Sequence, residues 1–301
     1  MRFSVIVPTF NRAAMLDDAI KSVLNQTFDD YELIVIDDGS TDETTELISV
    51  YPKAKWIHQE NSGVSIARNT GVSHAIGEYV CYLDSDDLWD QDYLSSIDRC
   101  IKTAKDPEFV FCDFVKHELA VSETPSDFGN SFFFPFVYEL GQPLNSDCVE
   151  FSTDKALELI LRGYAFYPTV CTIKREVHQN YRWDPNVFKS EDFNLFLKLF
   201  TRYSVCYLDK KLAVVRIHNN NKGADFLTKD RVHLATIRAV RALYQDNIPK
   251  TLFDEILSEK TFALARAYAR RSMFLVAVPL FLRSLTIENI RRWARRLLNL
   301  S

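Results

Sequence analysis

The stretch Tyr79–Asp87, with the sequence YVCYLDSDD, predicts a buried strand that ends in a group of carboxylates. Its first half consists largely of aromatic and β-branched strand formers, and Asp84, Asp86 and Asp87 follow directly. In open α/β sheets, ligands bind beyond the carboxyl ends of the strands, and clustered carboxylates favour a hard divalent cation. No lysine or arginine stands beside these acids in the sequence, so they indicate a metal site that serves phosphate chemistry.

Two plainer interpretations compete for the same acids. One is an N-cap for a helix predicted over Leu88–Ala104, although a single aspartate would suffice for that purpose. The other is a calcium-binding loop. Counting Asp84 as the first position of such a loop puts Trp89 at the sixth, where the sharp turn needs glycine. The calcium loop is therefore excluded, and a metal site is favoured over capping alone.

The chain around this stretch alternates between strand and helix patterns. Strands are predicted at 3–7, 31–36, 55–58, 79–83, 108–115, 170–174 and 211–217, and helices at 13–25, 41–50, 64–76, 153–162 and 191–200. Such alternation predicts an α/β fold with a mainly parallel sheet and helices on both faces. An aromatic run at 128–138 is interpreted as buried core rather than as an exposed ligand-binding surface, and the chain beyond residue 225 is predicted to be helical.

Composition and cysteine usage limit the class of protein. The 301 residues are 47% hydrophobic and 26% charged, which is typical of a globular chain. Six dispersed cysteines without a C-x-x-C pair indicate neither a zinc site nor a disulfide framework, so we expect reduced thiols. The first residues enter a strand without a basic, apolar signal region, and no stretch has the roughly 20 apolar residues of a spanning helix. We therefore expect a cytoplasmic protein.

Charge is distributed unevenly along the chain. The net charge is -5, but residues 261–301 hold eight arginines, no lysine and one acid, or +7; the rest has 28 basic and 40 acidic residues, or -12. The acidic body argues against nucleic acid as a partner. In the basic end, an apolar stretch at 273–282 precedes Arg283 and an Arg/Trp-rich segment, which suits peripheral contact with an anionic membrane surface. A helical hairpin with a solvated basic face is an equally open interpretation.

The first two predicted strands also end in polar motifs. These are Pro8-Thr9-Phe10-Asn11-Arg12 and Asp37-Asp38-Gly39-Ser40-Thr41-Asp42. Neither is a Rossmann fingerprint or a P-loop, because both glycine patterns are absent from the chain. The carboxylates of Asp37 and Asp38 suit the N–H groups of a base and the hydroxyls of a ribose. An ordinary turn aspartate followed by an N-cap before Thr41 explains them equally well.

Together with Asn61–Gly71 (NSGVSIARNTG) and Asp84–Asp87, these motifs resemble in their order the family 2 glycosyltransferases, which have the GT-A fold. The resemblance is strong over 3–95, returns at Ser190-Glu191-Asp192 and Arg216-Ile217-His218, and fades between about 116 and 165 and beyond 225. It implies a nucleotide-diphospho-sugar transferase fold with a donor-binding half at 1–105. An acceptor-binding and catalytic-base half at 106–225 and a C-terminal helical region at 226–301 would follow.

The resemblance also implies the site residues. Those expected on the nucleotide-sugar donor are Pro8, Thr9, Asn11, Arg12, Asp37, Asp38, Arg68, Asp84 and Ser85. Mn²⁺ or Mg²⁺ would lie on Asp86, with His218 as a further ligand. Asp192, with Glu191 beside it, would be the catalytic base. Taken alone, a helical arginine is usually a surface charge, a lone histidine is usually structural, and two acids in a first helical turn can simply complement the helix dipole.

The implied reaction is an inverting sugar transfer from a nucleotide-diphosphate sugar, UDP-linked by default, to a hydroxyl of a glycan or lipid-linked acceptor. Surface polysaccharide assembly at the inner face of the membrane is the implied setting. A sugar-1-phosphate nucleotidyltransferase is one alternative, but no glycine-rich loop follows the first strand. A non-catalytic nucleotide-sugar-binding protein is the other, and it would require a broken acid constellation, whereas every acid is present.

Overall fold

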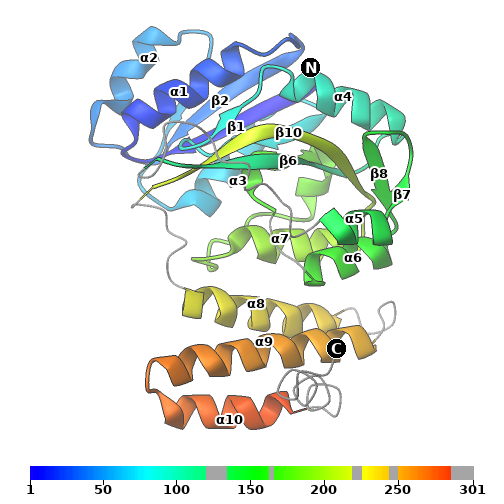
Figure 1. The fold of residues 1–301 in the computed structure, drawn as a ribbon. Helices are drawn as coiled ribbons and strands as arrows, with labels where there is room; N and C mark the ends of the chain where they lie inside the picture. Colours follow the sequence, from blue (N-terminus) through cyan, green and yellow to red (C-terminus); the bar gives the residue numbers. More distant parts are fainter. Residues whose placement is uncertain (120–133, 163–165, 219–225, 244–249, 286–301) are drawn as a thin grey trace. The chain divides into compact units, whose positions relative to one another are not determined.

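The computed structural model describes residues 1–119, 134–162, 166–218, 226–243 and 250–285. The chain divides into two compact units, Met1–Asn221 and Lys222–Ser301. The first unit is mixed α/β with a central sheet, and the described part of the second is helical (Figure 1).

The strands of the first unit are β1 (Phe3–Thr9), β2 (Tyr31–Asp37), β3 (Lys55–His58), β4 (Tyr79–Tyr82), β5 (Leu88–Trp89), β6 (Phe109–Glu118), β7 (Gln142–Pro143), β8 (Cys148–Phe151), β9 (Cys171–Lys174) and β10 (Val205–Ile217). Its helices are α1 (Ala13–Leu24), α2 (Leu47–Val50), α3 (Val64–His74), α4 (Tyr93–Thr103), α5 (Phe134–Leu140), α6 (Thr153–Arg162) and α7 (Glu191–Phe200), with 3-10 turns η1 (Glu43–Glu46), η2 (Pro168–Val170) and η3 (Arg175–Gln179).

The sheet has the strand order β3-β2-β1-β4-β9-β6-β10-β8-β7, and β5 pairs with β10. Strands β1 to β4 pair in parallel, as do β6 and β10, while β9 runs antiparallel between β4 and β6. These six strands, β1 to β4, β6 and β10, therefore point the same way, and their carboxyl ends lie toward one edge of the sheet. The predicted α/β architecture with a mainly parallel sheet is confirmed.

Helix α3 lies unusually close to the central strand β1. A Cβ atom at Gly71 would lie 2.4 Å from the Cγ2 atom of Ile6, so only glycine fits there without a shift. Strand β1 is buried along its whole length, and its pairing with β4 ends at Ile6. Pro8 follows that point and pairs only with β2, which explains how a proline is accommodated in a central strand.

The helix predicted over 88–104 is wrong at its start. Leu88–Trp89 instead forms β5, antiparallel to β10, and the indole of Trp89 stacks on the ring of Tyr93 at 3.9 Å. Helix α4 begins only at Tyr93, and its N-cap residue is Asp92. The acids at Asp84–Asp87 therefore do not cap a helix, and the capping interpretation of them is excluded.

Two other predicted elements differ from the structure by more than a few residues or in their type. The helix predicted at 41–50 is η1 followed by α2, with Asp42 as the cap of η1. Strand β10 begins at Val205 rather than at residue 211, because irregularities around Lys211 interrupt its apolar pattern while pairing continues on both sides. The aromatic run at 128–138 lies outside the described residues as far as position 133.

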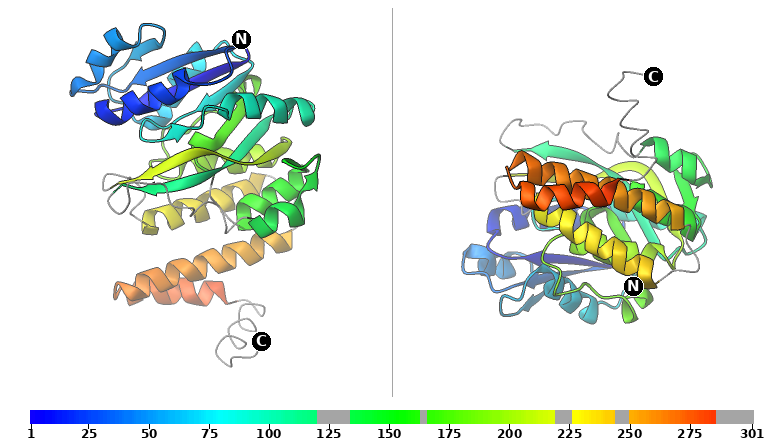
Figure 2. Two further views of the ribbon diagram at one scale, coloured as in Figure 1. Left: turned by 45° about the horizontal axis from the view of Figure 1, so that its top comes forward. Right: turned by 90° about the horizontal axis from the view of Figure 1, so that it is seen from below.

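The second unit contains α8 (Phe226–Leu243), α9 (Lys250–Arg270) and α10 (Phe274–Ser284). Helix α9 packs against both of the others (Figure 2). The second unit has a buried apolar core that includes Leu234, Leu264, Tyr268 and Ala277. Among the residues that the structure describes, no helix is both long and apolar enough to cross a membrane.

Candidate active site

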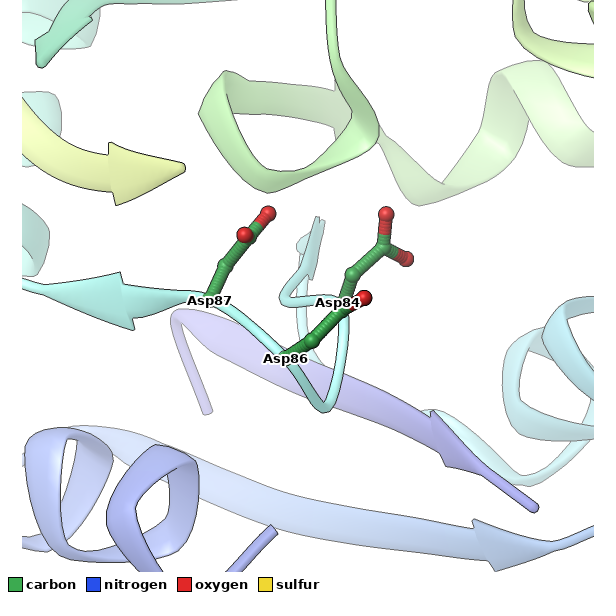
Figure 3. A group of neighbouring side chains, drawn as sticks. All are labelled: Asp84, Asp86 and Asp87. Atoms are coloured by element: carbon green, nitrogen blue, oxygen red, sulfur yellow. The ribbon is translucent and has the colours of Figure 1, made fainter. Parts of the chain in front are cut away.

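Three aspartates cluster in the loop between β4 and β5 (Figure 3). One carboxylate oxygen each from Asp84, Asp86 and Asp87 lies within 4.8 Å of the other two. Burial raises the pKa of Asp87 well above its usual range, and the carboxylates of Asp86 and Asp84 add to this effect. Burial also raises the pKa of Asp84, although Arg68 opposes it. The oxygen cluster that the sequence predicts is therefore present, and the fold keeps the three carboxyl groups together although their negative charges repel one another.

The expectation that no basic residue neutralises these acids is wrong. Three arginines reach the loop from distant segments: Arg12 Nη1 lies 2.5 Å from Asp86 Oδ2, Arg68 Nη2 lies 2.7 Å from Asp84 Oδ1, and the Arg216 backbone N–H donates to Asp87 Oδ1 at 3.0 Å. Their positions follow from the parallel sheet, which brings the ends of β1, β4 and β10 together. The residues next to the acids in the sequence do not indicate that these arginines contact them.

The acids nevertheless outnumber the arginines. The site contains the acids Asp84, Asp86, Asp87, Glu191 and Asp192 and the arginines Arg12, Arg68 and Arg216. The guanidinium of Arg216 pairs with Asp18, whereas Arg12 and Arg68 form side-chain ion pairs with these acids. The excess of acids would favour a divalent cation.

His218 follows β10 and lies beside the middle acid of the cluster. Its Nε2 atom is 3.0 Å from Asp86 Oδ2, the same oxygen that Arg12 contacts. Both side chains are largely buried. Carboxylate oxygens with one imidazole nitrogen are a donor set that Mn²⁺ and, with more water, Mg²⁺ accept. The residues present therefore fit a divalent cation.

Arg68 connects the acid cluster to the second acidic pair. The side chain is 3% exposed, and its Nη1 atom lies 3.0 Å from Glu191 Oε1 while Nη2 contacts Asp84. Burial alone would lower the pKa of Arg68, but the carboxylates of Asp84 and Glu191 raise it above its usual value. A permanently charged guanidinium therefore joins two segments that lie 107 residues apart in the sequence, at Asp84 and Glu191.

Trp183 supports this arginine, and sequence reasoning missed it. The Arg68 guanidinium lies 4.4 Å from the centre of the Trp183 ring, a cation–π contact. The side chain of Asn69 holds the Trp183 backbone on both sides, accepting from its N–H at 3.0 Å and donating to its carbonyl at 2.8 Å. The indole packs edge-on against Tyr82 and Phe196. A single tryptophan in an irregular segment gives no pattern from which this role could be predicted.

Thr169, in η2, fixes the third aspartate and was also missed. Its hydroxyl donates to Asp87 Oδ2 at 2.5 Å and accepts from the Asp84 N–H at 3.2 Å. Because the Arg216 N–H donates to Asp87 Oδ1, both oxygens of this carboxylate are used within the protein. Asp87 therefore anchors the loop to β10. The sequence contains no motif that signals Thr169.

The loops after β1 and β2 are joined by Asn11. Its side-chain oxygen accepts from the Thr41 N–H at 2.7 Å, and its own N–H donates to Ser40 Oγ at 2.9 Å. The backbone of Asn11 has φ of +50°, a left-handed conformation that asparagine tolerates better than most residues. Asp42 adds a contact by accepting from the Ala13 N–H at 3.1 Å. The two predicted motifs therefore form one continuous surface at the sheet edge.

Asp37 and Asp38 are both buried and engaged by the protein. Asp38 accepts from the N–H groups of Ser62 and Gly63, at 2.9 Å and 2.8 Å. Asp37 accepts from the Ser40 N–H at 2.9 Å, as a turn aspartate is expected to do. Neither caps the following helical turn, because that cap is Asp42.

Thr9 differs from these neighbours because its hydroxyl is unused. Its Oγ1 atom is buried and has no hydrogen-bond partner among the described residues, although a buried hydroxyl normally has one. Ser85, within the acid loop, is buried as well. An unsatisfied hydroxyl at the carboxyl end of β1 is consistent with a polar ligand group at this edge.

Glu191 and Asp192 form the first turn of α7, which has the bounds that the sequence predicts. Ser190 precedes them with φ of +58°, so the chain turns sharply into the helix. Burial raises the pKa of Tyr167, and the carboxylates of Asp192 and Asp87 contribute to the shift. Arg68 contacts both Asp84 and Glu191, so the acidic pair and the acid cluster lie on either side of one guanidinium.

A mainly parallel sheet with an aspartate cluster after β4 and a second acidic pair at α7, joined by one arginine, defines a GT-A type nucleotide-diphospho-sugar transferase fold. Residues 4–152 match the family Glycosyl transferase family 2. An uncharacterized glycosyltransferase of Rickettsia conorii is 32% identical over 220 residues, covering 72% of this chain and 33% of that protein. The chain belongs to glycosyl transferase family 2.

Two further comparisons concern shorter segments or the fold alone. The Bacillus subtilis protein TuaG, named as a candidate teichuronic acid biosynthesis glycosyltransferase, is 43% identical over 96 residues, or 30% of this chain and 38% of that protein. This chain thus spans about a third of the length of these curated relatives. Residues 1–349 of TarS from S. aureus, in complex with UDP-GlcNAc, share the fold with a TM-score of 0.68 at 19% identity, covering 95% of this chain and 82% of that one.

Proposed function

We propose that the chain is an inverting glycosyltransferase that moves a sugar from a nucleotide-diphosphate sugar, most simply a UDP-sugar, to a hydroxyl of a glycan or lipid-linked acceptor. The observation that carries this proposal is the double ion pair of Arg68 with Asp84 and Glu191. Arg68 thereby connects the aspartate cluster, which would hold the metal and the donor, to the acidic pair, which would supply the base. A transfer between two substrates requires both groups in one site. TarS in complex with UDP-GlcNAc and the name of TuaG support a UDP-sugar donor and a place in surface polysaccharide biosynthesis.

The donor would bind along the sheet edge formed by the ends of β1, β2 and β4. The proposed contacts are Pro8, Thr9, Asn11, Arg12, Asp37, Asp38, Arg68, Asp84 and Ser85. The unsatisfied hydroxyl of Thr9 supports this placement. Asp37 and Asp38 would act there through carboxylates whose orientation the surrounding loop already fixes. In this scheme 1–105 is the donor half, and 106–225 is the acceptor half.

Asp86 and His218 would hold the divalent cation, Mn²⁺ or Mg²⁺. When bound, the cation supplies positive charge to the leaving diphosphate. Asp84 would remain with Arg68 and face the donor, while Asp87 would keep its structural contacts to Thr169 and Arg216. Arg68 adds a fixed positive charge close to the developing negative charge of the leaving group.

Asp192 is the proposed catalytic base. The carboxylate of Glu191 pairs with Arg68. Asp192 stands next to it in the first turn of α7, where the helix dipole favours an ionised carboxylate. The Asp192 carboxylate would take the proton of the acceptor hydroxyl as the acceptor oxygen bonds to the anomeric carbon. The bond from that carbon to the diphosphate oxygen breaks at the same time. One base and in-line attack invert the anomeric centre.

We place this reaction in the cytoplasm at the inner face of the membrane. All six cysteines are free thiols in the structure, as a reducing compartment favours. The charge of +7 over residues 261–301 supports peripheral contact with an anionic surface.

Incubation of the purified protein with a panel of nucleotide sugars and Mn²⁺ tests the proposal. We expect free nucleoside diphosphate, with a strong loss of turnover in excess EDTA and in Asp86→Ala. Release of pyrophosphate would instead indicate a nucleotidyltransferase, and binding without turnover would indicate a binding protein. Undiminished transfer in EDTA would remove the metal from the mechanism.

A further inference from the structure

Helix α10 exposes an apolar surface that the core of the second unit does not use. Leu275 is 95% exposed, and Phe274 and Leu282 are each 60% exposed. Positions 275, 278 and 282 are spaced so that they share one face of the helix, and Val278 is also exposed. We call the exposed apolar side chains of Phe274, Leu275, Val278 and Leu282 the outer face of α10.

The opposite face of the same helix is the one that packs. Ala277 belongs to the buried core, with Leu280 against it, and the rings of Phe281 and Phe262 of α9 lie 5.9 Å apart. The hydroxyl of Ser258 donates to the Ser284 carbonyl at 2.6 Å. Packing on α9 therefore requires only the inner face. A helix that is apolar on both sides is normally buried on both, so the outer face calls for a partner.

The length of α10 limits what that partner can be. Its 11 residues span about 16 Å, roughly half of the 30 Å hydrocarbon core of a bilayer. The helix can therefore lie in a membrane surface but cannot cross it. An apolar helical face bordered by basic residues is the usual form of such a surface helix.

The charge around α10 is of one sign. From residue 260 to residue 287 the chain holds five basic residues and no acid: Lys260, Arg266, Arg270, Arg271 and Arg283. The four arginines are exposed. A second copy docked on this face would bring the two basic sets together at close range, which costs free energy. An anionic lipid surface would pair with them.

We propose that the outer face of α10 inserts into an anionic membrane surface, with Arg270, Arg271 and Arg283 on the lipid headgroups. This deepens the proposed location at the inner face of the membrane, on which it rests, and names the contact surface. Vesicle binding does not depend on sugar transfer, so a failure of one proposal leaves the other open to its own test.

Co-sedimentation of the full chain with vesicles tests this surface. The vesicles contain either phosphatidylcholine alone or phosphatidylcholine with 30% phosphatidylglycerol. The variant is the double substitution Leu275→Ser and Leu282→Ser, which alters only exposed side chains. Ile76→Ser, at another strongly exposed apolar position in the first unit, is the matched control. We expect the double variant to bind anionic vesicles at least about tenfold more weakly than the unchanged chain, and the control to bind equally well.

Several outcomes would overturn the proposal. Equal binding of the double variant and the unchanged chain to anionic vesicles is one, and absence of binding by the unchanged chain is another. A third is a solution dimer that the double variant dissociates, because the outer face would then bind a second copy. A chain that ends at residue 285 separates α10 from the four further arginines at 291–296. Retained binding by this chain supports α10, and complete loss assigns the contact to the removed segment.

Discussion

Substitution of Arg12 by alanine should tighten the binding of Mn²⁺ to the protein in the absence of nucleotide. Arg12 Nη1 and His218 Nε2 both contact Asp86 Oδ2, at 2.5 Å and 3.0 Å. If Asp86 receives the metal as proposed, the guanidinium occupies the oxygen that the metal needs. Metal binding then has to break the ion pair of Arg12 with Asp86, and the variant has no such pair to break.

The size of the effect follows from the exposure of the pair. Two unit charges about 4 Å apart near a protein surface attract by about 4 kcal/mol, but exposed pairs retain only up to about 1 kcal/mol after solvation and side-chain entropy. The Arg12 side chain is 25% exposed and that of Asp86 10%, which places this pair between the two limits. A net value of about 1–2 kcal/mol corresponds to Mn²⁺ binding that is about five- to thirtyfold tighter.

Titration of Mn²⁺ by calorimetry, or by the paramagnetic resonance signal of the free ion, measures this affinity directly. Lys21→Ala is the matched control, because it also removes one positive charge from the α1 region but involves only an exposed pair with Asp17. With Mn²⁺ present, UDP should bind Arg12→Ala more weakly, since the released guanidinium is a proposed donor contact. Mn²⁺ affinity that stays at the value of the control, or falls below it, refutes the reasoning.

Three further predictions concern the acidic pair, the contact of Thr169 with Asp87, and His178, a buried histidine in η3. Asp192→Asn should lower sugar transfer by about 10²–10⁴-fold with metal binding unchanged; loss of transfer in Glu191→Gln but not in Asp192→Asn would move the base to Glu191. Thr169→Val removes the hydroxyl that donates to Asp87 at 2.5 Å, so we expect a loss of about 1.5–3 kcal/mol in the free energy of unfolding by urea, and a loss below 0.5 kcal/mol would contradict this anchor role. Burial lowers the pKa of His178 from 6.5 to about 4. Between these pH values the unfolded chain binds a proton at this residue and the folded chain does not. The free energy of unfolding should therefore fall by about 3 kcal/mol as the pH drops from 6.5 to 4. In His178→Gln this part of the pH dependence should be absent, and an unchanged pH profile would show that another group causes it.

The sequence predicts those parts of the fold that repeat locally. Helices α6 and α7 have the predicted bounds because each carries an amphipathic pattern over its whole length. Strand β5 was missed because its two residues are fixed by pairing with β10, a contact that no local pattern reveals. The start of β10 was missed because charged residues around Lys211 interrupt its apolar pattern.

The same distinction applies to the candidate site. The acid loop and the pair at Glu191 are recognisable because several acids stand together in the sequence. Trp183 and Thr169 are not recognisable, because each supports the site through contacts with residues more than 80 positions away in the sequence. Their importance comes from the parallel sheet, which brings the ends of distant strands to one edge. Motifs can therefore predict the groups proposed to act on substrates, but not the residues that hold these groups in place.

The supporting contacts also explain why Asp86 is the acid best suited to exchange its partner. Asp84 is held by Arg68, whose side chain is only 3% exposed, and both oxygens of Asp87 bind buried groups. Replacing either set of partners would leave a buried charge uncompensated, at a cost of several kcal/mol. Asp86 is held by Arg12, the most exposed of the three arginines that contact the cluster, and water can solvate that guanidinium as it leaves. On the proposed metal binding, a cation would therefore enter at Asp86 while its two neighbours keep their contacts, without a rearrangement of the loop.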